Sequence, residues 1–241
     1  MLIKSNCNIN KRSVLFITLI IVICVICIIL AFLIRANNIT IGSYVVMGSY
    51  EQDNDILNGK EPIEWLVLAK ENNKVLLISR YALDSLPYSE HLKDIPWENC
   101  SLRTWLNANF INEAFNADEQ DSIIISNVTA DKNPEHDTEQ GGDTTDKLFL
   151  LSMKEANEYF DSDAARQCKC TEYCYAQGTC KSRETGNCWW WMRTMGDIDI
   201  DATVVDDEGP LQDCGDRVTV KETAVRPAMW VDLRNKDLVK K

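Results

Sequence analysis

The sequence predicts an α+β protein in which one mixed domain follows a single transmembrane helix. Three observations lead to this prediction. An uncharged apolar run covers Val14–Ile34 near the start of the chain. From Ile41 onward, short β-rich runs alternate with segments of helical periodicity. No internal repeat and no second change of composition divides this remainder, so we expect it to fold as one domain.

The apolar run predicts a membrane anchor with a defined orientation. It has 21 residues, and roughly 20 apolar residues cross the ~30 Å hydrocarbon layer as a helix. Lys4, Lys11 and Arg12 precede the run, which places the N-terminus inside the cell and the domain outside it. We therefore expect a single-pass protein of the cell membrane. Its expected segments are a cytoplasmic stub (1–13), the span (14–34), a linker (35–40), the extracytoplasmic domain (41–233) and a basic tail (234–241).

The charge of the chain argues against two classes of partner. Asp and Glu number 37 against 25 Lys and Arg, which gives a net charge of −12. Nucleic acids and anionic membrane surfaces attract basic patches. We therefore expect no nucleic-acid partner.

In the first half of the domain, strands are predicted at 41–47 and over 63–79, where two β-rich runs flank a turn as in a hairpin. Apolar residues recur on one helical face over 97–115, which predicts a helix. Asn116 with Glu119 has the pattern of a capping box for a further short helix. Residues 131–146 lack apolar side chains and are expected to form an exposed loop.

In the second half, a strand is predicted at 147–152, and Ser152 with Glu155 predicts the start of a helix. A cysteine-rich insert covers 166–188. Short strands are expected after it, at 188–193, 202–205, 217–220 and 223–233.

Six cysteines are concentrated in and after this insert. Their spacing lacks the paired C-x₂₋₄-C knuckles of zinc sites, and the domain has no C-x-x-C redox pair. In an exported domain such cysteines are expected to form disulfides, although six of them allow about 15 connectivities. Metal binding remains the alternative if the thiols stay reduced. The disulfide candidates are Cys168, Cys170, Cys174, Cys180, Cys188 and Cys214, whereas Cys100 is expected to be a buried free thiol.

An acidic stretch near the C-terminus has the spacing of a calcium-binding loop. Asp197, Asp199 and Asp201 occupy the first, third and fifth positions of an EF-hand loop, and Glu208 occupies the twelfth. Ala202 stands where the loop requires glycine, and neither flank has a helical pattern. The stretch therefore predicts either a looser calcium site or a solvated charged strand edge.

The run Trp189–Trp191 is the strongest aromatic feature. In a strand, Trp190 would face away from its two neighbours and could offer a platform for stacking a sugar, or it could belong to the core. Arg193 follows directly, either as a ligand contact or as a structural arginine. No catalytic residue is predicted, because neither histidine lies in a catalytic motif. The candidate ligand-binding residues are Trp190, Arg193, Asp197, Asp199 and Asp201.

Several linked motifs resemble one bacterial surface family. They include "PIEWLVL", "PWENCSLRTWLNANFINEAF", "WWWMRTMG" and "AVRPAMW", in this order along the domain. On these motifs the chain resembles the uncharacterised family called domain of unknown function 6273. The W-W-x-R and V-R-P-A strands are also similar to those of C-type-lectin-like and sulfatase-modifying-factor folds. This second resemblance implies a compact α+β domain with a loop-rich face used for binding.

Two functions follow from these resemblances. The first is a binding module outside the cell that recognises a carbohydrate or a surface protein. The alternative is a formylglycine-generating-like copper oxidase, because sulfatase-modifying enzymes hold copper with a close cysteine pair that Cys170 and Cys174 resemble. In those enzymes the pair follows the arginine-bearing strand, whereas here it precedes Arg193. We therefore predict binding rather than catalysis.

Overall fold

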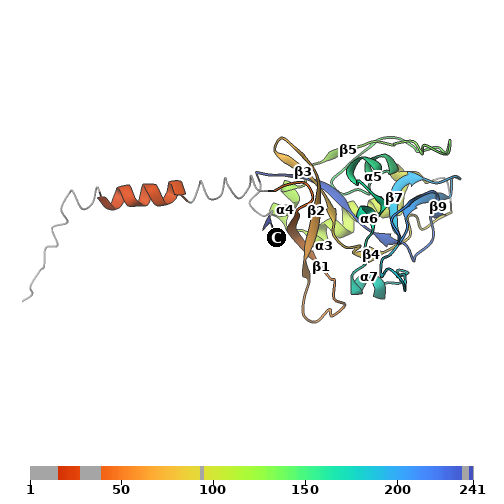
Figure 1. Cartoon of the computed structure of the whole chain (residues 1–241), viewed down its shortest axis with the longest axis horizontal. Coiled ribbons are helices and arrows are strands. Elements are labelled where there is room, and N and C mark those ends of the chain that lie inside the picture. The colour runs from red at the N-terminus through yellow and green to blue at the C-terminus, as the bar shows by residue number, and fades with distance from the viewer. Residues whose placement is uncertain (1–15, 28–38, 93–94, 235–238, 241) are drawn as a thin grey trace, which may run out of the picture. The chain divides into compact units, whose positions relative to one another are not determined.

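The computed structural model describes residues 16–27, 39–92, 95–234 and 239–240. The chain divides into two compact units, Met1–Ile39 and Thr40–Lys241. In the first unit, the structure describes a helix over residues 16–27 and, beyond it, Ile39. In the second unit, strands and short helices form a mixed α+β domain (Figure 1).

The predicted transmembrane helix is wrong. In the part of the chain that the structure describes, no helix is long and apolar enough to span a bilayer. The helix over residues 16–27 rises about 18 Å at about 1.5 Å per residue, which is well short of the ~30 Å hydrocarbon layer. The predicted stub, both ends of the predicted span, most of the predicted linker and most of the predicted basic tail lie outside the described residues, at 1–15, 28–38, 235–238 and 241. The predicted location as a single-pass membrane protein, with the N-terminus inside the cell and the domain outside, depends on this helix and is not supported either.

The first sheet is built around a hairpin. Its strand order is β11-β3-β2-β1-β12, and every neighbouring pair is antiparallel. The predicted hairpin is confirmed, because β2 and β3 flank a turn in which Asn72 has a φ of 49°. Trp65 of β2 and Leu77 of β3 are fully buried. The strands are β1 (Tyr44–Tyr50), β2 (Glu61–Glu71), β3 (Lys74–Ser79), β11 (Ala228–Asp232) and β12 (Val239–Lys240).

The second sheet contains the tryptophan run. All six residues of β7 are buried, and Trp190 and Trp191 are the largest of them. The strand predicted at 217–220 is wrong, because β9 ends at Arg217 and a turn follows. The sheet has the order β4 (Asp84–Ser85), β10 (Ala224–Val225), β7 (Trp190–Met195), β8 (Asp201–Val205) and β9 (Leu211–Arg217). A separate two-stranded sheet pairs β5 (Ser126–Val128) with β6 (Thr144–Asp146).

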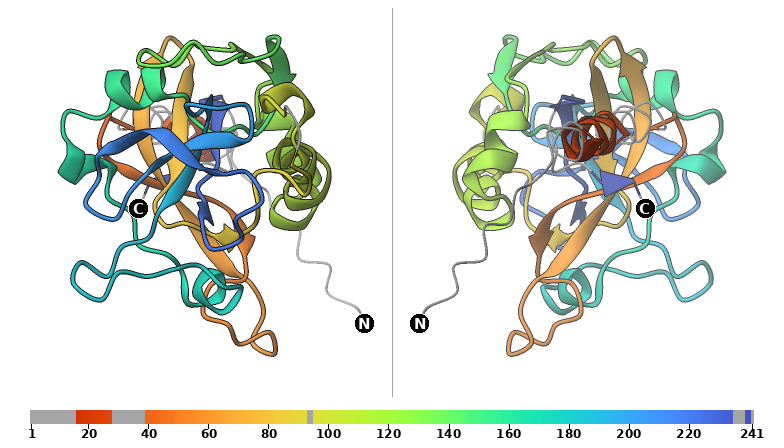
Figure 2. Two further views of the ribbon diagram at one scale, coloured as in Figure 1. Left: turned by 90° about the vertical axis from the view of Figure 1, so that its right-hand side faces the viewer. Right: turned by 90° about the vertical axis from the view of Figure 1, so that its left-hand side faces the viewer.

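Short helices cover the sheets, and the predicted helix over 97–115 is confirmed as a nearly continuous helical segment. Figure 2 shows this segment in yellow-green along one side of the domain. It consists of η1 (Trp97–Asn99), α2 (Ser101–Trp105), the π-helical η2 (Leu106–Phe110) and α3 (Ile111–Ala114). Both predicted capping boxes are present, at Asn116 and at Ser152. The remaining helices are α4 (Ala117–Ser122), α5 (Met153–Tyr159), α6 (Asp163–Arg166) and α7 (Glu172–Ala176).

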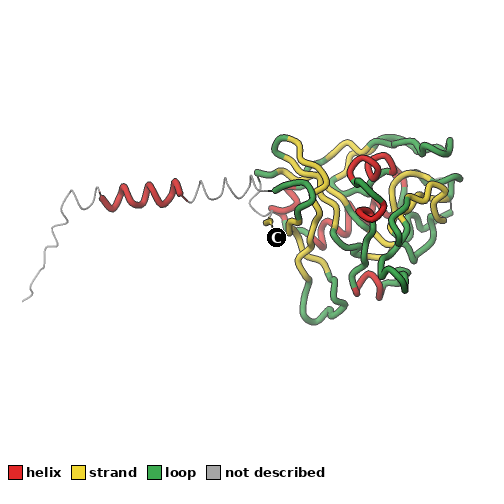
Figure 3. Tube along the Cα trace, viewed as in Figure 1, coloured by secondary structure: helices red, strands yellow, loops and turns green. Residues whose placement is uncertain are grey.

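Two loop predictions differ from the structure. Residues 147–152 form only an isolated bridge between Phe149 and Ala228, although all of them except Lys147 are buried, so the predicted strand is wrong. The segment 131–146 runs mostly as loop (Figure 3), but it is not wholly exposed. Asn133 is buried and donates from Nδ2 to the Met195 carbonyl at 2.9 Å. Buried polar side chains of this kind hydrogen-bond to backbone carbonyls. Such burial cannot be predicted from the lack of apolar residues in the segment.

Candidate functional site

A cleft of about 660 Å³ lies within the domain, between the start of β1, the residues after β3 and the segment from α5 through α6. Small-molecule sites typically measure roughly 300–1,000 Å³. The cleft is therefore large enough for a ligand of sugar or nucleotide size. Its polar and aromatic lining consists of Tyr44, Arg80, Tyr81, Tyr159, Phe160, Asp161, Gln167, Lys169, Asn187 and Arg226.

Arg80 is held at the cleft by aromatic rings and one carboxylate. Its guanidinium lies 4.6 Å from the Tyr44 ring centroid and 5.1 Å from that of Tyr81. Its Nη1 donates to Glu64 Oε2 at 2.6 Å, and this hydrogen bond raises the pKa of Arg80. Cation–π contacts and an ion pair fix the side chain, so the cleft presents a positioned cation.

Arg226 is the buried cation of the cleft. Its side chain donates to the carbonyls of Ser79 at 3.0 Å and Arg166 at 3.1 Å. It also lies over the rings of Trp190 and Phe160, at 4.9 Å and 5.6 Å from their centroids. The residue is only 3% exposed, and it forms no ion pair with any carboxylate of the described residues. An anion stabilises a buried positive charge of this kind, so Arg226 is suited to bind an anionic group of a ligand.

The remaining polar lining favours anions and hydrogen-bonding ligands. Lys169 is exposed, and Asp161 is the only acidic residue among the lining residues that the structure describes. Burial and neighbouring glutamates raise the pKa of Tyr159 to about 12. Its hydroxyl therefore stays protonated at neutral pH and can donate a hydrogen bond.

Four of the six predicted disulfide cysteines come together behind this cleft. We call Cys168, Cys170, Cys174 and Cys188 the thiol cluster; all four are buried. The Cys188 N–H donates to the Cys168 carbonyl at 2.9 Å, and the Cys170 thiol contacts those of Cys174 and Cys188. Every described cysteine is a free thiol. Cys180 and Cys214 are exposed and lie outside the cluster, so disulfide formation remains a prediction.

The thiols of the cluster divide into acidic and non-acidic members. The neighbouring thiols of Cys174 and Cys188 lower the pKa of Cys170 to about 3. Burial opposes ionisation of Cys168, but the Cys188 thiol and the charge of Arg226 outweigh it and lower its pKa. The pKa values of Cys174 and Cys188 are raised, for Cys174 chiefly by the neighbouring Cys170 thiol and for Cys188 by the thiols of Cys168 and Cys170, while burial adds to the effect. The cluster therefore holds thiolate character beside a cation, as reactive or metal-binding cysteines require.

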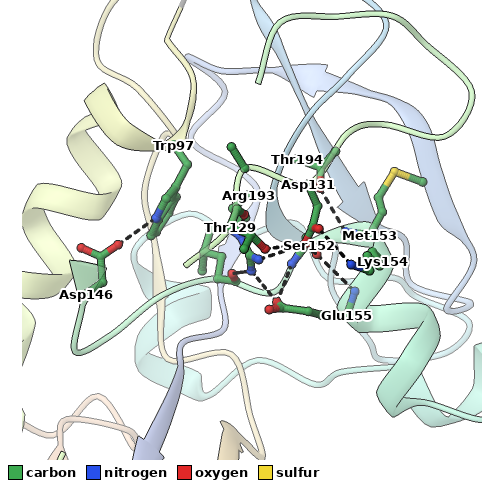
Figure 4. A network of polar contacts seen from close by, with 12 residues as sticks. Trp97, Thr129, Asp131, Asp146, Ser152, Met153, Lys154, Glu155, Arg193 and Thr194 are labelled. Carbon is green, nitrogen blue, oxygen red and sulfur yellow. Dashed lines mark hydrogen bonds and ion pairs between the residues drawn. The ribbon is translucent and has the colours of Figure 1, made fainter. Parts of the chain in front are cut away.

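Of the predicted ligand-binding residues, Trp190 and Arg193 belong to the interior. Trp190 is fully buried, and its indole N–H donates to the Arg166 carbonyl at 3.2 Å. Arg193 is 3% exposed and forms ion pairs with Glu155 and, at 3.3 Å, with Asp131 (Figure 4).

Further contacts complete the network around Arg193. Its Nη1 and Nε donate to the carbonyls of Leu150 and Thr129 at 2.8 Å and 3.2 Å. The Ser152 hydroxyl donates to Asp131 at 2.8 Å and also caps α5. Arg193 therefore ties α5 and the loop after β5 to β7. Its predicted ligand contact has not been tested, but its donors already have protein partners.

The acidic stretch does not converge on one point. Asp197, Asp199 and Glu208 are exposed, whereas Asp201 begins β8 and pairs with Arg217 at 2.7 Å. Among the described residues, no group of ligand atoms suited to a metal includes any of these carboxylates. Calcium at this stretch remains an untested prediction.

Sequence reasoning missed a group formed by His136, Asp213 and Cys214. His136 Nε2 lies 3.1 Å from Asp213 Oδ2 and 3.7 Å from Cys214 Sγ. A catalytic Cys-His-Asp relay uses both imidazole nitrogens, whereas here one nitrogen meets both partners, so the group lacks triad geometry. A bulge in β9 permits this contact, because residues 213–215 face a single residue of β8.

The fold and the site define the chain as a mixed α+β domain with a cationic, ligand-sized cleft backed by buried thiols. The chain belongs to the family described as a domain of unknown function (DUF6273), which matches residues 72–233. The predicted family membership is thereby confirmed. No curated protein and no solved structure matches the chain. The resemblance to C-type-lectin-like and sulfatase-modifying-factor folds therefore stays a prediction.

Proposed function

We propose that this chain is a binding module whose cleft takes a small anionic ligand, with an acidic sugar as the ligand class. One observation carries the proposal: Arg226 is a buried cation that lines a 660 Å³ cleft and has no carboxylate partner among the described residues. An anionic group of the ligand would give Arg226 the carboxylate partner that the described residues do not provide.

The charge of the cleft lining, which is opposite in sign to that of the whole chain, supports an anionic ligand. The chain carries a net charge of −12, yet the cleft is lined by Arg80, Lys169 and Arg226 against Asp161 alone. A local reversal of sign concentrates ligands of the opposite charge. The cleft thus favours an anion that the rest of the surface repels.

The neutral lining supports a sugar. Tyr44, Tyr81 and Tyr159 combine apolar ring surface with hydroxyl groups, and Gln167 and Asn187 add amides. Sugars pair hydroxyl groups with apolar C–H faces, and aromatic and amide side chains match both. A uronic acid has the hydroxyl groups and C–H faces of a sugar together with a carboxylate, which would pair with Arg226.

Calorimetric titration with glucuronate and with glucose tests the proposal. We expect glucuronate to bind and glucose to bind far more weakly, because glucose lacks the carboxylate. Lys169→Gln removes an exposed cation from the lining and should weaken glucuronate binding by about three- to fivefold, the effect of losing up to about 1 kcal/mol.

Lys132→Gln serves as the matched control, since Lys132 is 84% exposed and does not line the cleft. It should leave the affinity unchanged. Equal affinity for the two sugars, or no heat of binding with glucuronate, would contradict the proposal.

A copper-dependent modifying enzyme is the second candidate, favoured by one observation. The thiols of Cys170 and Cys174 are in contact, and copper(I) prefers soft thiolate ligands. These two residues would hold the ion, and copper would supply the redox centre of an oxidase. Competition with a copper(I) chelator tests this, with Cys170→Ser expected to lose binding and Cys180→Ser to retain it. A reduced chain that takes no copper(I) from the chelator rules the second candidate out.

A further inference from the structure

Three carboxylates meet where β1 passes into β2. Glu51 follows the last residue of β1, and Glu61 is the first residue of β2. Tyr50 pairs with Glu61 across the two strands, so strand pairing brings Glu51 and Glu61 to the same end of the sheet. Asp53 lies in the connecting loop. One carboxylate oxygen from each of the three acidic residues lies within 4.8 Å of the other two.

The loop itself holds two of these carboxylates in place. Glu61 Oε2 accepts hydrogen bonds from the N–H groups of Gln52 at 2.7 Å and Asp53 at 3.4 Å. Asp53 accepts from the Asp55 N–H and from the Asn58 side-chain amide, both at 2.8 Å. The arrangement is therefore built by the backbone of the loop rather than by chance contacts of long side chains.

The third carboxylate is buried without a partner on one oxygen. Glu51 is 7% exposed, and its Oε1 has no hydrogen-bond partner. Burial of an ionised carboxylate oxygen is costly unless the oxygen is paired or coordinates a metal. An observation independent of the clustering therefore indicates a missing positive partner at this point.

The protein does not supply that partner. Across the described residues, no Lys, Arg or His nitrogen forms an ion pair within 4.0 Å of Glu51, Asp53 or Glu61. Lys60 is the nearest basic residue in sequence, but its Nζ pairs with Glu113 Oε1 at 3.3 Å and donates to the Glu113 carbonyl. Three carboxyl groups thus face one another with no cation of the chain between them.

We propose that Glu51, Asp53 and Glu61 form a calcium-binding site. The three residues offer only oxygen atoms, which hard divalent cations prefer, whereas transition metals favour nitrogen or sulfur ligands. Calcium accepts about six to eight oxygens in irregular geometry, and three carboxylates can supply up to six of them. Magnesium demands a near-ideal octahedron and retains water, so it suits this close group of carboxylates less well.

An ion here would also fix the position of the cysteine-rich insert. Figures 1 and 2 show the β1–β2 loop beside α7. The Gln52 carbonyl accepts from the Tyr173 N–H at 3.0 Å, and the rings of Tyr50 and Tyr173 lie 5.7 Å apart. Calcium would hold the loop against α7, which carries Cys174 of the thiol cluster. The site thereby connects ion binding to the geometry of the thiols.

Calorimetric titration of the full chain with calcium chloride, after removal of metals by chelation, tests the proposal. We expect one bound ion, and Glu51→Gln should weaken its binding by about tenfold or more, because affinity follows the charge of the ligand set. Glu51→Gln should also raise the thermal midpoint of the metal-free chain, because it removes one of three facing negative charges. A carboxylate with a purely structural role would not give this increase.

Two variants serve as matched controls. Asp55→Asn removes an exposed carboxylate of the same loop that lies outside the group, and Asp199→Asn removes one from the acidic stretch. Both should bind calcium as the unaltered chain does. Absence of any calcium heat at millimolar concentration would overturn the proposal. Undiminished calcium binding by both Glu51→Gln and Glu61→Gln would overturn it as well.

Discussion

Substitution of Arg193 by methionine should strongly destabilise the domain. The Arg193 side chain is 2% exposed and pairs with Glu155 and Asp131, whose side chains are 23% and 12% exposed. Methionine fills much of the volume but leaves Glu155 without its cation and leaves Asp131 with only the exposed Lys154 as a partner. Removal of one partner from a buried ion pair costs about 3–5 kcal/mol. For a domain of this size, about 1 kcal/mol shifts the thermal midpoint by roughly 2–4 °C, so a decrease of about 6–20 °C is expected.

Thermal unfolding followed by circular dichroism measures this decrease, together with chemical denaturation for the free energy of unfolding. Arg183→Met is the matched control, because Arg183 is exposed and should change the midpoint little. The triple variant that adds Glu155→Gln and Asp131→Asn should recover part of the lost stability, since it removes the negative charges that Arg193 pairs with. A loss of less than about 1 kcal/mol for Arg193→Met would refute the reasoning, because that value is typical of an exposed pair.

Three further outcomes are expected. At about pH 5, where ordinary thiols are protonated, the reduced chain should retain the ultraviolet absorbance of a thiolate. Cys170→Ser should lower this absorbance, whereas Cys180→Ser should not. An equal effect of the two variants would contradict the pKa of about 3 for Cys170. Because that pKa lies below the ordinary value of 9.0, the contribution of Cys170 to stability should fall as pH decreases from 9.0 toward 3, and a stability profile unchanged by Cys170→Ser would argue against it. Asn116→Ala should lower the free energy of unfolding by about 1 kcal/mol, because it removes a helix cap. Gly48→Ala should lower it further, because Gly48 has a φ of 70° and an added Cβ would lie 2.7 Å from Phe115. The reverse order of the two losses would show that the backbone at Gly48 relaxes freely.

Local chemistry explains which parts of the fold could be predicted from the sequence. The β2–β3 hairpin and the capping boxes at Asn116 and Ser152 depend on neighbouring residues only, so their patterns identified them correctly. Residues 147–152 have a strand-like composition, but they form a largely buried loop that makes one bridge to β11. Tertiary packing overrode local propensity there.

The apolar run at the N-terminus shows the limit of composition. Its length and lack of charge matched a membrane span, yet the described helix covers only residues 16–27. The argument from compartment for disulfides depended on that span, so it no longer supports them. The grouping of Cys168, Cys170, Cys174 and Cys188 is instead a fact of the fold.

The candidate site could be predicted only in part, because it joins residues far apart in the chain. Arg226 was visible in its motif, but its relation to Arg80 and Lys169 requires the folded cleft. Trp190 and Arg193 drew attention as a rare aromatic run and a nearby charge, and both proved to lie in the interior. Spacing cannot distinguish a buried arginine with protein partners from one that lacks a carboxylate.

A crystal structure of the domain soaked with glucuronate would show whether the cleft binds an acidic sugar. We expect a sugar in the cleft, with its carboxylate within hydrogen-bond distance of Arg226, Arg80 or Lys169 and its ring against a tyrosine of the lining. A glucuronate bound only outside the cleft, or a cleft that stays free of sugar at saturating concentration, would contradict it.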